Sequence, residues 1–385
     1  MQYVLLLRNN PVLEFNVNDT YITGIDKIYN EQLIPYSIRN NISAQALNKW
    51  FSKRLIPGNR ENVKNLLKQT KCSSIYELAY MNHALSLSDQ YWVRSNEECL
   101  DWHSINYFTN DFDKDVGNIL FGSTTDNGIS VRSPDITTNG VMKKSWRVKD
   151  GIRYLYKAGL HENKGREAIN EMAISRFVNS GGIPGIRCAE YSLTKIQGEI
   201  CSKSKLFLAE NIELVPASYL YFSEPKDEKD TPHKHLIKAC KNAGIDDIRK
   251  FLDGMMVLDF LTCNKDRHLG NFGFLRNTET MEFIGPAPLY DNGTSLWCSD
   301  DTITSTIFDN VCKRSPFASF YSDQIKLVRS DIYNRINVEL LKKEYMNTIE
   351  KAGADRKRAA IVCRKIDERN ILLEKALTKE REIER

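Results

Sequence analysis

The feature that most restricts the fold of this chain is a polar loop that directly follows an apolar helix. Apolar residues between Ile248 and Met256 recur at the spacing of one buried helix face. The next segment, residues 259–274, has the sequence DFLTCNKDRHLGNFGF and ends in a pattern typical of a strand. Charged and amide side chains gathered between a buried helix and a strand indicate a functional site on a rigid support.

Three side chains in and after this loop have the spacing that phosphoryl transfer requires. Asp266 and Asn271 are five residues apart, like the catalytic base and the metal-binding amide in the catalytic loop of kinases. Asp291, in the segment LYDNG, matches a metal-holding aspartate that precedes a glycine. These side chains offer the hard oxygen ligands that Mg²⁺ prefers. Each motif alone is common in loops, but the combination predicts a phosphotransferase site.

Residues upstream of the loop are expected to hold the phosphates of a nucleotide. Lys157 ends the segment RYLYK, which is predicted to be the second strand of a hairpin. The helix predicted over 164–180 carries Glu167 and Glu171 on one face. Glu171 lies deeper in the helix beside apolar neighbours, so we expect it to be the acidic partner of Lys157. The alternative for both residues is a surface position.

A glycine turn precedes the predicted hairpin. The segment TTNGVMKKSW contains one glycine, Gly140, where phosphate-binding loops usually contain several. Backbone amides of a turn at Asn139 and Gly140 can still contact phosphate, helped by Lys143 or Lys144. Gly140 is therefore an expected nucleotide contact.

The strand and helix patterns predict an α+β protein in three parts. An N-terminal α+β domain is expected over residues 1–132, with partner binding as its suggested role. Between 133 and 212, the order strand, strand, helix, strand, strand predicts a small lobe. The remainder, 213–385, is predicted to be a mainly helical large lobe that carries the polar loop.

Some single elements are predicted with defined bounds. Residues 3–7 and 12–17 are expected to be strands because of their apolar and alternating patterns. Residues 221–235 are charged and contain two prolines, so we predict an exposed, mobile loop there. The C-terminal segment from 337 is predicted to be a helical pair that is broken near Gly353.

Composition and charge exclude several classes of protein. With 41% hydrophobic residues the chain is too apolar to be disordered, and it contains no window near the ~20 apolar residues that span a bilayer. Lys and Arg number 54 and Asp and Glu 50, so the net charge of +4 predicts no strong direct binding of DNA. The nine cysteines lack the paired spacing of zinc sites, and the N-terminus lacks a signal-peptide pattern. We expect a cytoplasmic protein with reduced thiols.

The motif DFLTxNxDRHxxNxG, joined to YDNG, resembles the HipA-like serine/threonine kinases. These bacterial proteins have a bilobed kinase fold related to the phosphoinositide 3/4-kinases, and many are toxins paired with a DNA-binding antitoxin. The resemblance covers the kinase core, about residues 135–340, and the N-terminal part resembles poorly characterised Gram-positive relatives. It implies a bilobed kinase-like fold and an ATP- and Mg²⁺-dependent protein serine/threonine kinase.

The resemblance also implies a role for each residue that matches the family motif. Asp266 would be the catalytic base, and His268 of the DRH motif would order the catalytic loop. Asn271 and Asp291 would bind Mg²⁺, and Lys157 would contact the phosphates of ATP.

Two further segments match the family. The segment LAENIE resembles the linker between the lobes, whose backbone receives adenine, so Glu210 and Ile212 are expected nucleotide contacts. Some family members autophosphorylate a loop serine and thereby silence themselves. The corresponding region here is 133–145, without a match close enough to name the residue.

The substrate is not visible in the residues. Known relatives act on aminoacyl-tRNA synthetases, so a synthetase or another translation factor is one expected substrate class, and the chain itself is another. The family also makes an antitoxin or regulatory partner an expectation. Two other functions stay open: a small-molecule phosphotransferase, although such enzymes usually place His before the Asp, and a nucleotide-binding regulator without catalysis that acts through a partner protein or DNA.

Overall fold

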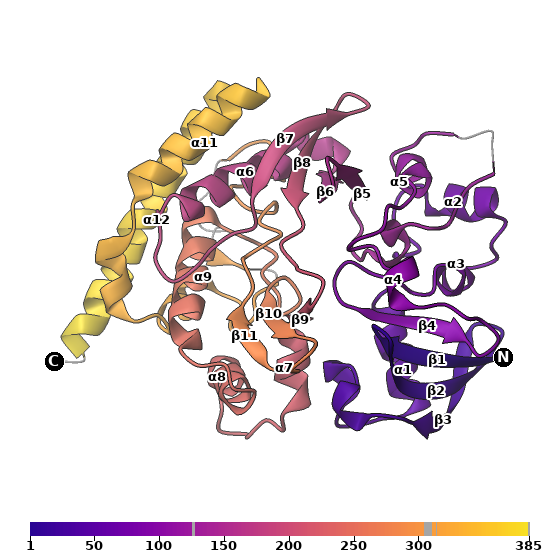
Figure 1. Ribbon diagram of the computed structural model, residues 1–385. Coiled ribbons are helices and arrows are strands. Elements are labelled where there is room, and N and C mark those ends of the chain that lie inside the picture. The colour runs from indigo at the N-terminus through magenta and orange to yellow at the C-terminus, as the bar shows by residue number, and fades with distance from the viewer. Residues whose placement is uncertain (125–127, 304–309, 313, 384–385) are drawn as a thin grey trace. The chain divides into compact units, whose positions relative to one another are not determined.

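A computed structural model describes residues 1–124, 128–303, 310–312 and 314–383 (Figure 1). The chain forms two compact units and passes between them several times. The first unit comprises 1–157, 205–215 and 275–283, and the second comprises 158–204, 216–274 and 284–385. The division into domains over 1–132, 133–212 and 213–385 stays a prediction.

The first unit is built on a four-stranded antiparallel sheet in the order β3-β2-β1-β4 (Figure 1). On β1, Leu5 and Leu7 pack into one apolar cluster, whereas Val4 and Leu6 pack into another together with Trp92. Both faces of this interior strand are therefore covered, which explains its uninterrupted apolar sequence. The strands are β1 (Gln2–Leu7), β2 (Asn10–Asn18), β3 (Tyr21–Ile28) and β4 (Tyr91–Ser95).

The strands predicted over 3–7 and 12–17 are confirmed as β1 and β2. The sequence analysis misses β3 and β4 for two different reasons. β3 is an edge strand that is mostly exposed, so it lacks a clear apolar face. β4 is short and pairs with β1, far away in the sequence, so tertiary pairing rather than local pattern defines it.

The rest of the first unit consists of short helices and a hairpin. The hairpin turns at Asp150 and Gly151, which both have positive φ angles, as the Asp-Gly signal predicts. Its first strand begins at Lys144. The elements are α1 (Ala44–Ser52), α2 (Val63–Thr70), α3 (Ile75–Met81), α4 (Trp102–Ile105), α5 (Asp115–Leu120), β5 (Lys144–Lys149) and β6 (Ile152–Ala158).

A small sheet lies where the chain passes back through the first unit. Its strand order is β11-β10-β9. Buried Arg276 on β10 forms an ion pair with buried Glu213 on β9, which ties these two strands together. The strands are β9 (Ile212–Pro216), β10 (Gly273–Asn277) and β11 (Phe283–Pro286).

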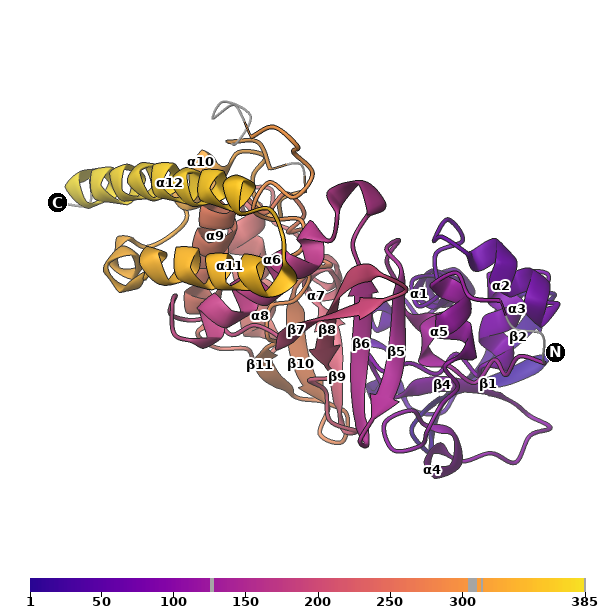
Figure 2. The same cartoon turned by 90° about the horizontal axis from the view of Figure 1, so that it is seen from above.

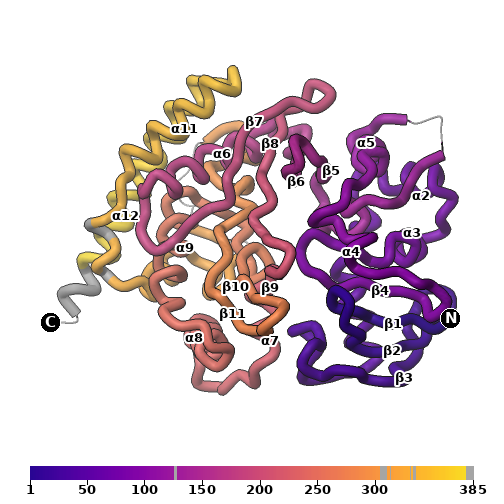
Figure 3. The backbone as a smooth tube through the Cα atoms, in the orientation of Figure 1, coloured from indigo at the N-terminus to yellow at the C-terminus, as the bar shows by residue number. Residues whose placement is uncertain are grey.

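The second unit is mainly helical. It also contains the hairpin of β7 and β8, which Figure 3 traces from end to end. Helix α11 packs against α6 and α12, and Figures 1 and 2 both show α11 and α12 side by side, with the predicted break at Gly353. The elements are α6 (Arg166–Asn179), β7 (Tyr191–Ile196), β8 (Glu199–Lys205), α7 (Ala217–Ser223), α8 (Pro232–Asn242), α9 (Ile248–Thr262), α10 (Tyr321–Ile325), α11 (Val338–Ala352) and α12 (Arg356–Ile383).

The prediction of a mobile loop over 221–235 is wrong at both ends. Helix α7 continues to Ser223, and α8 begins at Pro232. Thr231 caps α8 by accepting the N–H of Lys234, and proline is favoured at a first helical position. Charge and proline content suggest a loop here, but these helix-start signals and the buried face of α8 decide the structure.

Among the helices of the described residues, none is long and apolar enough to cross a membrane.

Candidate active site

The residues predicted to act on phosphate fall into two groups. Asp266, His268 and Asn271 lie in the loop between α9 and β10 of the second unit, and Asp291 follows β11 in the same unit. Glu171 lies on α6, also in the second unit. The other expected nucleotide contacts, Gly140, Lys157, Glu210 and Ile212, belong to the first unit.

The loop begins where a buried helix ends. α9 is almost wholly buried, and its last turn carries a buried carboxylate, Asp259. The helix stops because Cys263 adopts a left-handed conformation with φ +51°, after which the N–H of Asn264 donates to the Asp259 carbonyl at 3.0 Å. A carboxylate at the buried end of an apolar helix requires a charged or hydrogen-bonding partner.

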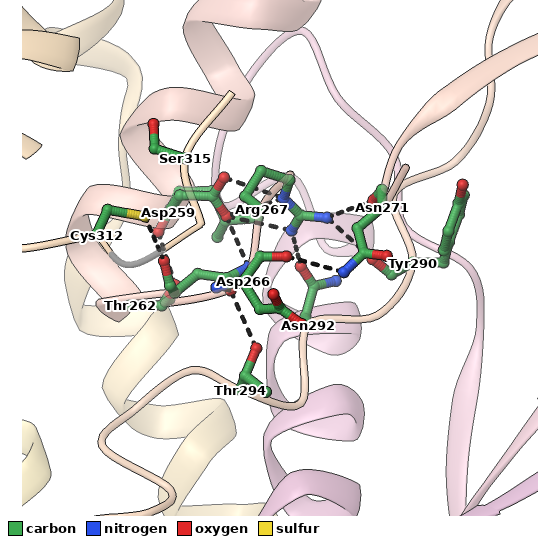
Figure 4. Close-up of polar contacts among 12 residues, drawn as sticks. Asp259, Thr262, Asp266, Arg267, Asn271, Tyr290, Asn292, Thr294, Cys312 and Ser315 are labelled. Carbon is green, nitrogen blue, oxygen red and sulfur yellow. Dashed lines mark hydrogen bonds and ion pairs between the residues drawn. The ribbon is translucent and has the colours of Figure 1, made fainter. Parts of the chain in front are cut away.

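Arg267 is that partner, and it lies at the centre of the site (Figure 4). Its guanidinium binds both carboxylate oxygens of Asp259, with Nε 3.0 Å from Oδ2 and Nη2 3.1 Å from Oδ1. Nη1 donates to the carbonyls of Asn271 at 2.8 Å and Tyr290 at 3.0 Å, and Nη2 donates to the side-chain oxygen of Asn292. One side chain therefore joins the end of α9, the catalytic loop and the segment that contains Asp291.

The charge of Arg267 is stabilised by its surroundings. The side chain is 1% exposed. Burial by itself lowers the pKa of Arg267, but the carboxylate of Asp259 and its hydrogen bonds outweigh burial and raise it. A bidentate pair with rigid fork geometry holds its neighbours in one arrangement.

Two amide side chains complete the loop. Asn264 is fully buried; its Nδ2 donates to Asp259 at 3.0 Å, and its Oδ1 accepts the N–H of Asp266 at 3.1 Å. Asn271 Nδ2 donates to the Asp266 carbonyl at 2.8 Å. Since its nitrogen is engaged, the oxygen of Asn271 is the atom that can bind a cation.

His268 bends back onto its own loop. Its Nδ1 accepts the N–H of Gly270 at 3.0 Å, which requires a neutral ring with the proton on Nε2. Burial lowers the pKa of His268, although the nearby carboxylate of Asp266 acts in the opposite direction. This geometry fits a residue that orders the loop, which stays a prediction.

Asp266 carries the carboxylate with the predicted catalytic role. Its side chain is 25% exposed, so a substrate can reach it. Oδ1 lies 3.0 Å from Nη1 of Arg314, an exposed arginine further along the chain.

Asp291 sits in a conformation that non-glycine residues seldom adopt. Its φ is +58°, in the left-handed region, where aspartate is among the better tolerated residues. Its N–H donates to the hydroxyl of Tyr191 at 3.4 Å. Because one nitrogen of Arg267 binds the carbonyls of both Asn271 and Tyr290, the backbone at Asn271 lies close to the residue before Asp291.

In the described residues, no group of three or more His, Cys, Asp or Glu side chains is arranged to hold a metal ion. Asp291 and Asn271 together offer one carboxylate and one amide oxygen. Mg²⁺ is commonly bound by one or two carboxylates together with phosphate oxygens and water. The donor set therefore fits a magnesium ion that arrives with a nucleotide.

Glu171 is buried on α6, as predicted. Its Oε2 accepts a hydrogen bond from the hydroxyl of Ser202 on β8. Lys157 belongs to the first unit and Glu171 to the second. The pairing of these two side chains stays a prediction.

In the first unit, Gly140 forms the expected turn. Its φ is +96°, and its N–H donates to Asn139 Oδ1 at 2.6 Å. Its carbonyl accepts from Nε of Arg60 at 2.8 Å. The two lysines nearby are engaged with protein groups, because Lys143 Nζ lies 3.2 Å from Glu61 Oε1 and Lys144 Nζ donates to the Asn139 carbonyl at 2.8 Å.

The other predicted contacts of the first unit also have protein surroundings. Lys157 is buried on β6, opposite Lys144. The side chain of Glu210 accepts from Nε1 of Trp102 at 2.9 Å. The N–H of Ile212 donates to the Ala209 carbonyl at 3.0 Å, and its carbonyl accepts from Gln90 at 2.9 Å. Nucleotide binding at these positions stays a prediction.

The residues that assemble the site were not predicted. The motif DFLTxNxDRHxxNxG contains Asp259, Asn264 and Arg267, but no role was predicted for them. A usable signal was present, because Asp259 is a carboxylate in a helix whose neighbours are nearly all apolar. Such a residue predicts a buried cationic partner nearby in the sequence.

Comparison with known proteins gives a curated relative and two solved structures. No protein-family model matches the chain. The serine/threonine-protein kinase CtkA of Helicobacter pylori is 28% identical over 175 residues, which are 44% of this chain and 52% of CtkA. The chain thus matches this curated relative over about half of the relative's length.

Both solved structures match in fold. The crystal structure of the H. pylori proinflammatory kinase CtkA aligns with a TM-score of 0.51 and 22% identity, over 63% of this chain and 95% of CtkA. HipA of Shewanella oneidensis MR-1, solved in a toxin–antitoxin complex with HipB and operator DNA, aligns with a TM-score of 0.56 and 12% identity over 97% of both chains. The predicted α+β, kinase-like fold is confirmed, and these similarities agree with the resemblance to the HipA-like kinases that the sequence shows.

Proposed function

We propose that this chain is an ATP- and Mg²⁺-dependent protein serine/threonine kinase. The observation that carries the proposal is the arrangement around Arg267, which gathers the Asp266 loop and the Asp291 segment into one rigid site. Asp266 and Asn271 have the separation of kinase catalytic loops, and Asp291 follows Tyr290, whose carbonyl shares a nitrogen of Arg267 with that of Asn271.

In this proposal each side chain has a simple task. The carboxylate of Asp266 would accept a hydrogen bond from the substrate hydroxyl and take its proton as the oxygen attacks the γ-phosphorus, while the bond from that phosphorus to the β,γ-bridging oxygen breaks and ADP leaves. Asn271 and Asp291 place their oxygens where a cation would sit. A bound Mg²⁺ would neutralise charge on the phosphates. Lys157 would contact the phosphates of ATP.

The catalytic loop is prepared for this task before substrate binds. The backbone of Asp266 is fixed at both ends, by Asn264 at its N–H and by Asn271 at its carbonyl. Preorganised positions of this kind avoid reorganisation during the reaction. The backbone of Asp266, the proposed base, is therefore held in place, while its side chain stays partly exposed.

The test is the intact mass of the purified chain before and after incubation with Mg²⁺ and ATP. We expect a gain of phosphoryl groups in the parent and none in Asp266→Ala or Asp291→Ala. Asp323→Ala, which removes an exposed carboxylate paired with Lys326 on α10, is the matched control and should behave like the parent. Normal phosphorylation of both site variants would refute the assignment. Turnover with aminoglycosides or other small alcohols, and not with proteins, would instead indicate a small-molecule phosphotransferase.

The ion pair between Arg314 and Asp266 favours a second function, that of a nucleotide-binding regulator. In this structure the proposed base is already paired, at 3.0 Å, with an exposed cation. A protein of this kind would bind nucleotide and signal through a partner without turnover. Thermal stabilisation by Mg²⁺-ATP with no gain of mass, on the chain or on added protein substrates, would favour it.

We also propose a regulatory partner of antitoxin type. The support is that the HipA structure was solved with HipB and operator DNA and aligns over nearly the whole of this chain. In the proposed assembly the partner would supply any contact with DNA, because the near-balanced charge of this chain predicts no strong direct binding of DNA. The protein substrate and the toxin role belong to the same proposal.

A further inference from the structure

Helix α6 is fastened directly to the backbone that follows Asp291. Asn170, which is 1% exposed, donates its amide to two carbonyls of that segment, at 3.0 Å to Gly293 and at 2.6 Å to Ser295. Both hydrogens of the amide are thus used on main-chain acceptors. Buried carbonyls of an irregular segment need such donors, and here a helix side chain supplies them.

The contact is close because residue 293 is glycine. A Cβ built on Gly293 would lie 3.0 Å from the Cβ of Glu167 and 3.3 Å from its carbonyl oxygen, one helical turn before Asn170. A side chain at this position would therefore require the segment or the helix to shift by a few tenths of an ångström. At the start of α6, Arg166 extends the attachment by donating to the Cys298 carbonyl at 2.9 Å.

These contacts hold the chain just after the residues that Arg267 binds. Arg267 holds the residues on either side of Asp291 through the Tyr290 carbonyl and the Asn292 side chain. Asn170 holds the chain from residue 293 onward. A non-glycine residue with φ +58° persists only where its surroundings fix it. Arg267 and Asn170 are two side-chain donors that hold the chain before and after Asp291.

We propose that Asn170 is a positioning residue that fixes Asp291 in its left-handed conformation, so that helix α6 sets the affinity for Mg²⁺ beside the nucleotide. This inference rests on the proposed function, because it assumes that Asp291 binds the metal. The next residue on the helix is Glu171, whose carboxylate is bonded to Ser202. A movement of α6 would therefore displace Glu171 and Asp291 together.

The experiment compares Asn170→Ala with a matched control, Asn48→Ala. Asn48 is also a helix asparagine that donates its amide to two carbonyls, of Ile22 at 2.7 Å and Ala44 at 2.9 Å, but it lies on α1 in the first unit. The readout is the thermal stabilisation of each full-length protein by ADP as Mg²⁺ is titrated, with kcat and KM for ATP measured alongside. Stabilisation by ADP without Mg²⁺ reports on nucleotide binding alone.

We expect Asn170→Ala to raise the half-maximal Mg²⁺ concentration by about 10-fold to 100-fold, as loss of a residue supporting a metal ligand does. Binding of metal-free ADP should be unchanged, and Asn48→Ala should lower the Tm without changing the Mg²⁺ dependence. Gly293→Ala, which keeps the amide but displaces the segment, should act in the same direction as Asn170→Ala and replaces it if that variant does not fold.

The outcomes separate the inference from the proposed function. Equal Mg²⁺ dependence in the parent and in a folded Asn170→Ala or Gly293→Ala variant would overturn the positioning role and leave the kinase proposal standing. If Mg²⁺ does not affect the binding of ADP to the parent protein at all, then Asp291 does not bind the metal. Both the kinase assignment and this inference would then be wrong.

Discussion

Two buried arginines, one in each unit, organise the loops on which the proposed function depends, and they do so differently. Arg267 binds a carboxylate through two nitrogens and then three further oxygens around the Asp266 loop. Arg60 in the first unit binds only carbonyls, those of Gly140 at 2.8 Å and of Thr138. Its Nη1 is buried and has no hydrogen-bond partner among the described residues.

The pKa values of the two guanidinium groups are shifted in opposite directions. Burial lowers the pKa of Arg60 to about 10, and the carboxylate of Asp135 nearby only partly opposes this. The pKa of Arg267 is raised, because Asp259 more than offsets its burial. A buried guanidinium with its own carboxylate builds a rigid site, whereas one that holds carbonyls alone forms a weaker attachment. The Asp266 loop should therefore be the more rigid of the two.

The largest expected effect is at Arg267. Arg267→Met leaves Asp259 buried without its cation and frees two carbonyls, so we expect a loss of about 3–5 kcal/mol in the free energy of unfolding. Urea denaturation of the full chain at pH 7 measures this loss. Nucleotide-dependent phosphorylation should be lost as well, because the Asp266 loop and the Asp291 segment are no longer joined.

Arg60→Met is the matched comparison. It also removes a buried guanidinium, but from carbonyls rather than from a bonded carboxylate, so we expect a loss of roughly 1–3 kcal/mol. A loss as large as that of Arg267→Met would mean that Asp135 depends on Arg60 as strongly as Asp259 depends on Arg267. The contrast drawn between the two loops would then be wrong.

The parts of the site that the sequence could predict are those that lie close together in the sequence. Asp266, Asn271 and Asp291 lie on short segments with fixed spacing, so a local motif is sufficient to find them. Gly140 was found as a turn because a positive φ leaves a local signal. Its anchor, Arg60, comes from a distant part of the chain, and no local pattern connects the two.

The fold shows the same limit. Strand β1 has an uninterrupted apolar run, and strand β2 and helix α6 have periodic patterns; the structure confirms all three elements. Strand β4 is defined by its pairing with β1, and helix α8 by its capping and buried face, against the charge of the surrounding segment. A local apolar or alternating pattern is sufficient to predict β1, β2 and α6, whereas the position of β4 depends on pairing with a distant strand.

An effect of intermediate size on stability is expected from Asp135 in the first unit. It is fully buried and accepts the N–H of Trp146 at 2.7 Å, while the hydroxyls of Ser133 and Ser145 donate to its other oxygen. Burial raises the pKa of Asp135 to about 6, although the Trp146 N–H and Arg60 oppose this. In the region expected to contain a regulatory serine, Ser133 and Ser145 are thus both buried against one carboxylate.

The pH dependence follows from the direction of this shift. A pKa above the unfolded value of about 3.9 means that the folded state binds the proton more tightly, so this contribution to stability is present at low pH and is lost as pH rises through about 6. Between pH 4 and pH 7 the parent should lose roughly 2 kcal/mol relative to Asp135→Asn, measured by urea denaturation at each pH. A difference that is constant over this range would mean that Asp135 stays ionised throughout.

The smallest expected effect on stability comes from a substitution at Gly270, in the Asp266 loop. A Cβ on Gly270 would lie 2.9 Å from Cε1 and 3.0 Å from Nδ1 of His268, the ring that accepts the N–H of Gly270. Gly270→Ala should therefore cost about 1–2 kcal/mol of stability, because a tightly packed loop must move to admit a methyl group. Urea denaturation measures this cost, and a fall in kcat should accompany it if His268 orders the loop.

Gly58→Ala in the first unit is the control, because a Cβ there meets nothing within 4 Å. Its effect should stay within about 0.5 kcal/mol. Two equal and small effects would show that His268 moves aside freely. The Asp266 loop would then be no more rigid than an exposed turn, and Arg267 alone would not be enough to preorganise the base. A clear difference between the two variants would instead locate the rigidity in the loop itself, since both substitutions add the same methyl group.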